Sequence, residues 1–178
     1  MEGTIHGREC DGRNSISGNT VKFSSYALRK CLIGFGAVNG VLNAVIFWFM
    51  HSGDMTVQFD FVGIVADLAI TGLILGAILF ACAVPLTKRD MRAGAFVSPE
   101  TFGGVAGVVP RSYGVAMLVI AVVAGTFMGL LGIVAASALS APISAATMMA
   151  LKGCACAFGG AAAGYLSLVF TARSFGGR

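Results

Sequence analysis

Charged residues are scarce in this chain. Only 11% of its 178 residues are Asp, Glu, Lys or Arg, whereas 57% are hydrophobic. Soluble globular domains carry about 25% charged residues, so the composition predicts an integral membrane protein rather than a water-soluble domain. The 12 basic residues outnumber the 8 acidic ones. In so apolar a chain, an excess of basic residues is typical of a membrane protein whose Lys and Arg lie on the cytoplasmic side, near anionic lipid. We therefore expect no nucleic acid partner.

Catalytic and metal-binding signatures are also missing. The sequence contains no HExxH, GxSxG or CxxC motif, which are signatures of metalloproteases, serine hydrolases and thiol redox or metal sites. Its five cysteines form no paired pattern. Cys154 and Cys156 are two residues apart, which places their thiols about 200° apart on a helix. We therefore expect no enzymatic activity, no cofactor and no metal site.

The N-terminal residues have neither apolar periodicity nor the apolar core of a signal peptide. Residues 1–26 are rich in Gly, Ser, Asn and charged residues, a composition typical of flexible chain. The sequence thus predicts a flexible cytoplasmic tail at 1–26 and a single transmembrane domain at 27–178.

Long apolar runs take the place of charge. The clearest is FVGIVADLAITGLILGAILFACAV, residues 61–84. A helix of about 20 residues, at about 1.5 Å per residue, crosses the roughly 30 Å of a bilayer core. Three further runs are of similar length, so the predicted fold is all-α, with four transmembrane helices in an up-down bundle. The predicted spans are residues 28–50, 61–84, 113–139 and 143–171, with Pro85 ending the second and a cytoplasmic loop at 86–112.

The distribution of basic residues predicts the orientation of the bundle. Lys and Arg occur in the N-terminal tail, in the 86–112 loop and in the C-terminal tail, whereas the 51–60 and 140–142 connections contain neither. Because basic loops stay in the cytoplasm, we expect both termini to be cytoplasmic, in the plasma membrane. The same order of elements occurs twice: a basic segment, an outgoing helix, a short turn and a returning helix. This order is compatible with two hairpin repeats.

Each predicted span contains two glycines four residues apart. In lipid, such pairs let helix backbones approach closely, which replaces the hydrophobic effect as a source of association. Four pairs in four spans favour a tightly packed bundle over a wide aqueous pore. The predicted helix-packing glycines are Gly36, Gly40, Gly72, Gly76, Gly125, Gly129, Gly160 and Gly164.

Two ionisable residues lie inside the predicted spans, Asp67 in the second and Lys152 in the fourth. A charge at the centre of a bilayer costs about 2.5–3.5 kcal/mol or more, so each residue needs a partner. Counted along their helices, both fall about 10–15 Å below the outer surface. Asn39, Asn43 and Thr71 fall at this depth or one turn deeper. We expect these five residues to form one polar layer.

Two interpretations of the polar layer remain open. In the first, it is the substrate-binding or ion-binding site of a small permease-type transport protein or transporter subunit, with Asp67 as a proton or cation site and Lys152 as its gate or counter-ion. In the second, the polar residues only lock the order of the helices, and the protein is a non-catalytic accessory or assembly factor. Four spans are few for a transporter. Both interpretations therefore expect a homodimer or another membrane subunit, besides the lipid bilayer.

Overall fold

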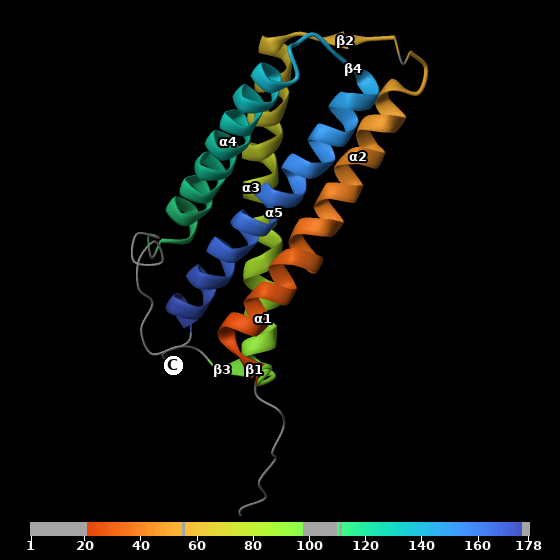
Figure 1. The fold of residues 1–178 in the computed structure, drawn as a ribbon. Helices are drawn as coiled ribbons and strands as arrows, with labels where there is room; N and C mark the ends of the chain where they lie inside the picture. The colour runs from red at the N-terminus through yellow and green to blue at the C-terminus, as the bar shows by residue number, and fades with distance from the viewer. Residues whose placement is uncertain (1–20, 55, 98–109, 111, 176–178) are drawn as a thin grey trace, which may run out of the picture.

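The computed structural model describes residues 21–54, 56–97, 110 and 112–175. Four long helical rods lie side by side in it (Figure 1). The first rod, called the first helix below, joins α1 (Phe23–Arg29), the π-helical segment η1 (Lys30–Ala37) and α2 (Val38–His51). The other three rods are α3 (Phe61–Arg92), α4 (Tyr113–Ala138) and α5 (Ala145–Phe175). All four are long and apolar enough to cross a membrane.

The helices extend further than the predicted spans at one end of the bundle. The first helix begins at Phe23, so the predicted tail includes a structured part, whereas residues 1–20 lie outside the described residues. α3 continues through Pro85 to Arg92, so the predicted end at Pro85 was wrong. α5 likewise continues to Phe175. The prediction equated each helix with its apolar part. Arg and Lys are good helix formers, and a proline is tolerated where packing holds the helix on both sides of it.

Two pairs of short strands connect the ends of the helices. β2 (Gln58–Phe59) runs antiparallel to β4 (Ile143–Ser144), with Phe59 opposite Ile143. β1 (Val21–Lys22) runs parallel to β3 (Phe96–Val97). Because β2 and β4 immediately precede α3 and α5, these two helices start at the same end of the bundle. The first helix and α4 finish at that end (Figure 1), so consecutive rods run antiparallel.

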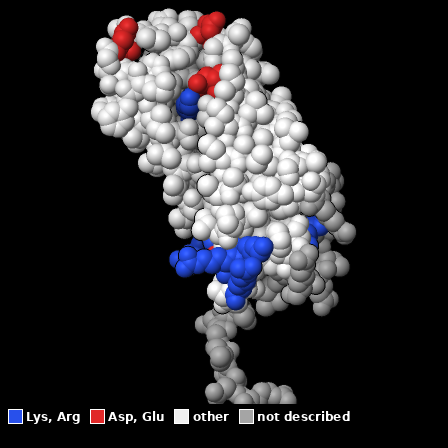
Figure 2. All heavy atoms as spheres, turned by 180° about the vertical axis from the view of Figure 1, so that it is seen from behind, with Lys and Arg blue, Asp and Glu red and all other residues white. Residues whose placement is uncertain are grey.

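The two ends of the bundle carry opposite charge (Figure 2). The acidic end is defined by Asp54 and Asp60, which lie between the first helix and α3. The basic end carries one acid, Asp90, among the described residues. Its basic residues are Lys22, Arg29, Lys30, Lys88, Arg89, Arg92 and Arg173. In the described part of the chain, only Asp67 and Lys152 carry charged side chains in the band between these ends.

This band is apolar on its outer surface. Val62, Val134 and Phe158, on three different helices, are 69%, 66% and 66% exposed. The first helix contributes further exposed side chains, such as Val41 and Leu32. Soluble monomers rarely expose apolar surface so continuously, whereas lipid chains solvate it. The surface is therefore compatible with a multi-pass membrane protein.

α5 is the central helix and packs against α2, α3 and α4, while α3 and α4 form the closest pair. Glycines make these approaches possible. A Cβ atom at Gly40 would lie 2.8 Å from the carbonyl oxygen of Gly153, and one at Gly72 would lie 2.7 Å from that of Ala124. Any side chain there would push the helices apart. The other six glycines of the predicted pairs also face a neighbouring helix: Gly36, Gly160 and Gly164 between the first helix and α5, and Gly76, Gly125 and Gly129 between α3 and α4.

Candidate functional site

The candidate site lies where α3 and α5 each complete their second turn from the acidic end. α3 begins after Asp60, whose side-chain Oδ1 accepts a hydrogen bond from the backbone N–H of Gly63 at 2.9 Å, a typical N-cap. α5 begins at Ala145, directly after β4. Because β2 and β4 pair, both helices start at one level, and Asp67 and Lys152 are then about two turns in on each helix.

Asp67 and Lys152 form an ion pair. The Nζ atom of Lys152 donates to Oδ1 of Asp67 at 2.8 Å. The Lys152 side chain is 13% exposed and that of Asp67 is 34% exposed. The second carboxylate oxygen, Oδ2 of Asp67, is buried and has no hydrogen-bond partner among the described residues. Figure 2 shows one blue and one red group together in the apolar surface below the acidic end. Among the described residues, Asp67 and Lys152 are the charged residues of this band.

An aromatic cluster of Phe47, His51 and Phe59 contacts this pair from the acidic end. The Lys152 ammonium lies 5.4 Å from the centre of the Phe47 ring, within the range of a cation–π interaction. The ring of His51 stacks on Phe47 at 4.2 Å. Phe59 packs against Phe47 at 5.6 Å and against His51 at 5.5 Å. The sequence prediction missed this cluster because an aromatic side chain near a helix end also fits an interfacial belt.

The remaining residues of the predicted polar layer do not bind the pair directly. Asn39 donates its side-chain amide to the carbonyl oxygen of Phe35 at 2.6 Å, and Asn43 donates to that of Asn39 at 2.9 Å. Thr71 is half-buried, one turn further along α3. No hydrogen bond joins these three side chains to Asp67 or Lys152 in the described part of the chain. Of the five predicted residues, the structure brings together two.

The loop before α3 gives the acidic end its charge. The Asp54 carboxylate accepts hydrogen bonds from the side-chain hydroxyl of Thr56 at 2.5 Å and from its backbone N–H at 2.9 Å. These bonds favour the ionised form, so they lower the pKa of Asp54 below its usual value. Together with Asp60, whose side chain caps α3, Asp54 forms an acidic rim above Asp67 that attracts cations.

A second polar cluster lies at the basic end. Tyr26 donates its hydroxyl to Oδ2 of Asp90 at 2.5 Å, and Lys30 forms a salt bridge with the same carboxylate. The Tyr26 ring stacks on Phe96 with a centroid separation of 4.3 Å. The cluster fastens the start of the first helix to the end of α3. The sequence prediction missed it because ending α3 at Pro85 placed Asp90 in a loop.

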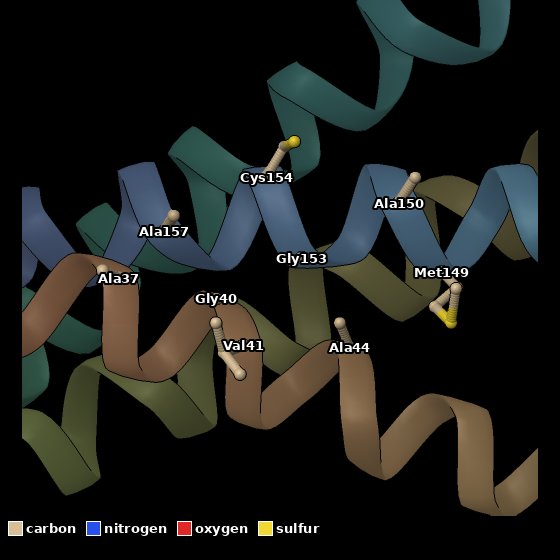
Figure 3. A pocket seen from close by; sticks show the side chains of 9 residues that line it. All are labelled: Ala37, Gly40, Val41, Ala44, Met149, Ala150, Gly153, Cys154 and Ala157. Atoms are coloured by element: carbon tan, nitrogen blue, oxygen red, sulfur yellow. The ribbon is translucent and has the colours of Figure 1, made fainter.

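Apolar grooves run between the helices, and Figure 3 shows the one between α2 and α5. A groove of about 380 Å³ between α2 and α5 is lined by small residues, among them Gly40, Ala44 and Gly153. Another, of about 440 Å³, lies between α1–η1 and α5, and a third, of about 350 Å³, lies between α3 and α4. None of these three grooves is lined by Asp67 or Lys152. Within the described residues, no three His, Cys, Asp or Glu side chains are grouped to hold a metal ion.

The fold and site define a class of protein, a helical chain with four apolar rods long enough to be membrane spans and, within their apolar band, the Asp67–Lys152 ion pair. No protein-family model, curated protein or solved structure matches the chain. Its function therefore has to be argued from the site itself.

Proposed function

We propose that this chain is a small multi-pass transport protein of the plasma membrane, or a subunit of one, with Asp67 as its cation site. The observation that carries the proposal is the Oδ2 atom of Asp67, which is buried without a partner beside the Lys152 ion pair. A buried carboxylate oxygen that accepts no hydrogen bond costs about 1–3 kcal/mol or more. An ion pair that only held helices together would be expected to satisfy both oxygens.

The position of the pair also supports a transport role. Ionisable residues inside membrane spans frequently mark the paths of ions and substrates. Asp67 keeps 34% of its side chain exposed, so its carboxylate is not completely enclosed by the packed core. Among the described residues, the rim above it carries Asp54 and Asp60 and no Lys or Arg, which raises the local concentration of cations.

The charge distribution supports one orientation in the membrane. The basic end would face the cytoplasm and the acidic end the outside, because Lys and Arg are retained on the cytoplasmic side. Both termini would then be cytoplasmic. In this orientation the Asp67 site lies in the outer half of the bundle, roughly 10 Å below the start of α3.

The groove between α2 and α5 supports a second candidate, an accessory or assembly role. Gly40, Ala44 and Gly153 line it with small side chains, and such surfaces accept another transmembrane helix. In that case the ion pair would be structural, and a second copy or another membrane subunit would occupy the groove.

Solid-supported membrane electrophysiology on proteoliposomes separates the two candidates. H⁺, Na⁺, K⁺ and small ammonium cations are applied in separate concentration jumps. At least one of these cations is expected to give a transport current with the wild-type chain, and that current should be lost in Asp67→Asn. Asp90→Asn is the matched control, because it makes the same change in the same helix but at the basic end, away from the Asp67 site. If the wild type gives no current with any cation, while a partner membrane protein co-purifies and is lost in Gly40→Val, the accessory role replaces the transport role.

A further inference from the structure

We infer that the Asp67 site binds a small primary ammonium cation. The ammonium group of Lys152, which is covalently attached to α5, occupies the position that the ammonium group of the ligand would take. This inference rests on the proposed transport function and specifies its substrate class. It follows from what surrounds the Lys152 ammonium, namely a carboxylate on one side and an aromatic ring on the other.

The surroundings of the Lys152 ammonium match what an alkylammonium ion requires. Oδ1 of Asp67 accepts one of its N–H bonds at 2.8 Å. The buried Phe47 ring lies 5.4 Å from Nζ and offers its negative face to the charge. A primary ammonium has three N–H donors, and Oδ2 of Asp67 is a second buried acceptor that Lys152 does not use. A free ligand, not restrained by a helix backbone, can donate to both oxygens.

A metal cation fits these surroundings poorly. Hard cations are held by several oxygen ligands, about 6–8 for Ca²⁺. Among the described residues, Asp67 supplies the one carboxylate at this depth, and the Nδ2 groups of Asn39 and Asn43 hold these side chains along their own helix rather than beside Asp67. An aromatic ring in place of further oxygens favours a cation that binds through both charge and N–H groups.

The aromatic cluster covers the Asp67 site on the side that faces the acidic end. Phe47 contacts the Lys152 ammonium, and His51 and Phe59 pack on Phe47. Phe59 belongs to β2, whose pairing with β4 lies directly before α5, the helix that carries Lys152. A ligand that displaces Lys152 would therefore meet Phe47 first, and a change in the position of the Phe47 ring would be transmitted to the rest of the cluster.

Binding of radiolabelled propylammonium to the detergent-purified full chain tests the inference. Propylammonium matches the atoms that Lys152→Ala removes beyond Cβ. We expect saturable binding to the wild type and binding at least about tenfold tighter to Lys152→Ala, because a tethered competitor lowers apparent affinity. Asp67→Asn should abolish binding, and Phe47→Leu should weaken it about 2–5-fold. Unlabelled propylammonium should compete, whereas tetramethylammonium, which has no N–H group, and NaCl should compete at least tenfold less well.

Two binding results would decide against the inference. Binding to Lys152→Ala without saturable binding to the wild type would show an ion pair that a ligand does not open, and equal binding to Asp67→Asn would place the ligand elsewhere. If Lys152→Ala does not fold, the competition series on the wild type alone decides whether the site selects a primary ammonium. Transport is scored separately by the current measurements. Propylammonium binding without any current would support the ammonium site and contradict the transport function. Currents with other cations and no propylammonium binding would support the transport function and contradict the ammonium site.

Discussion

The ammonium of Lys152 and the carboxylate of Asp67 meet at 2.8 Å although 85 residues separate them in the chain. Each lies on a different apolar helix, about two turns from the acidic end. In the described part of the chain this is the one pair of opposite charges within the apolar band. It pairs two charges that would each be costly alone in an apolar band, and it leaves Oδ2 of Asp67 free to accept a further hydrogen bond.

Removing one partner of this pair should cost more stability than removing both. Lys152→Met or Asp67→Asn alone is expected to lower the free energy of unfolding by about 1–3 kcal/mol, less than for a fully buried pair because a third of Asp67 is exposed. The double variant should be more stable than Lys152→Met, since it leaves no unpaired charge. Unfolding in mixed micelles with increasing denaturing detergent measures these differences. Strictly additive losses would mean that the two side chains do not interact.

Close helix packing at Gly40 should make this position intolerant of side chains. A Cβ there would lie 2.8 Å from the carbonyl oxygen of Gly153, so Gly40→Val is expected to separate the first helix from α5 and to destabilise the fold by about 1–3 kcal/mol. Gly34→Val in the same helix is the matched control, because the nearest atom to its Cβ is a Lys30 side-chain carbon at 3.8 Å. Equal stability of the two variants in thermal unfolding would contradict the packing.

The cluster at the basic end should hold the start of the first helix in place. Asp90→Asn and Tyr26→Phe each remove part of the contact between α1 and α3. We expect amide hydrogen exchange in α1 to become about 5-fold faster, which corresponds to about 1 kcal/mol for one lost hydrogen bond. Exchange at α4 should not change. Asp54→Asn, in the loop at the other end, serves as the control, and acceleration of α1 in that variant would point to a general loss of stability.

The proposed orientation is tested by labelling with a membrane-impermeant maleimide. In a cysteine-free background, Ser52→Cys at the acidic end should be labelled in intact cells. Ser24→Cys at the basic end should be labelled only after permeabilisation. The opposite pattern would invert the bundle in the membrane and place the Asp67 site near the cytoplasm.

Composition and apolar run length were sufficient to predict the four helices, because the cost of exposing a backbone to lipid leaves few other structures for such runs. They did not predict the helix ends at the basic end. Lys88, Arg89 and Asp90 are polar, and their helical conformation depends on α3 continuing through Pro85 and on the contacts of Asp90 with Lys30 and Tyr26. The local sequence does not indicate such long-range contacts.

The site was predictable in part. The sequence by itself determined that Asp67 and Lys152 need partners, because an isolated charge in lipid is costly, and that they lie at one depth, because helix rise is constant. Only the tertiary structure decided which groups meet. The rotation of each helix directs Lys152 toward Asp67 and the Phe47 ring, while Asn39 and Asn43 bond to their own helix. That rotation is set by how glycine faces pack across helix pairs, a property of several segments together and of none alone.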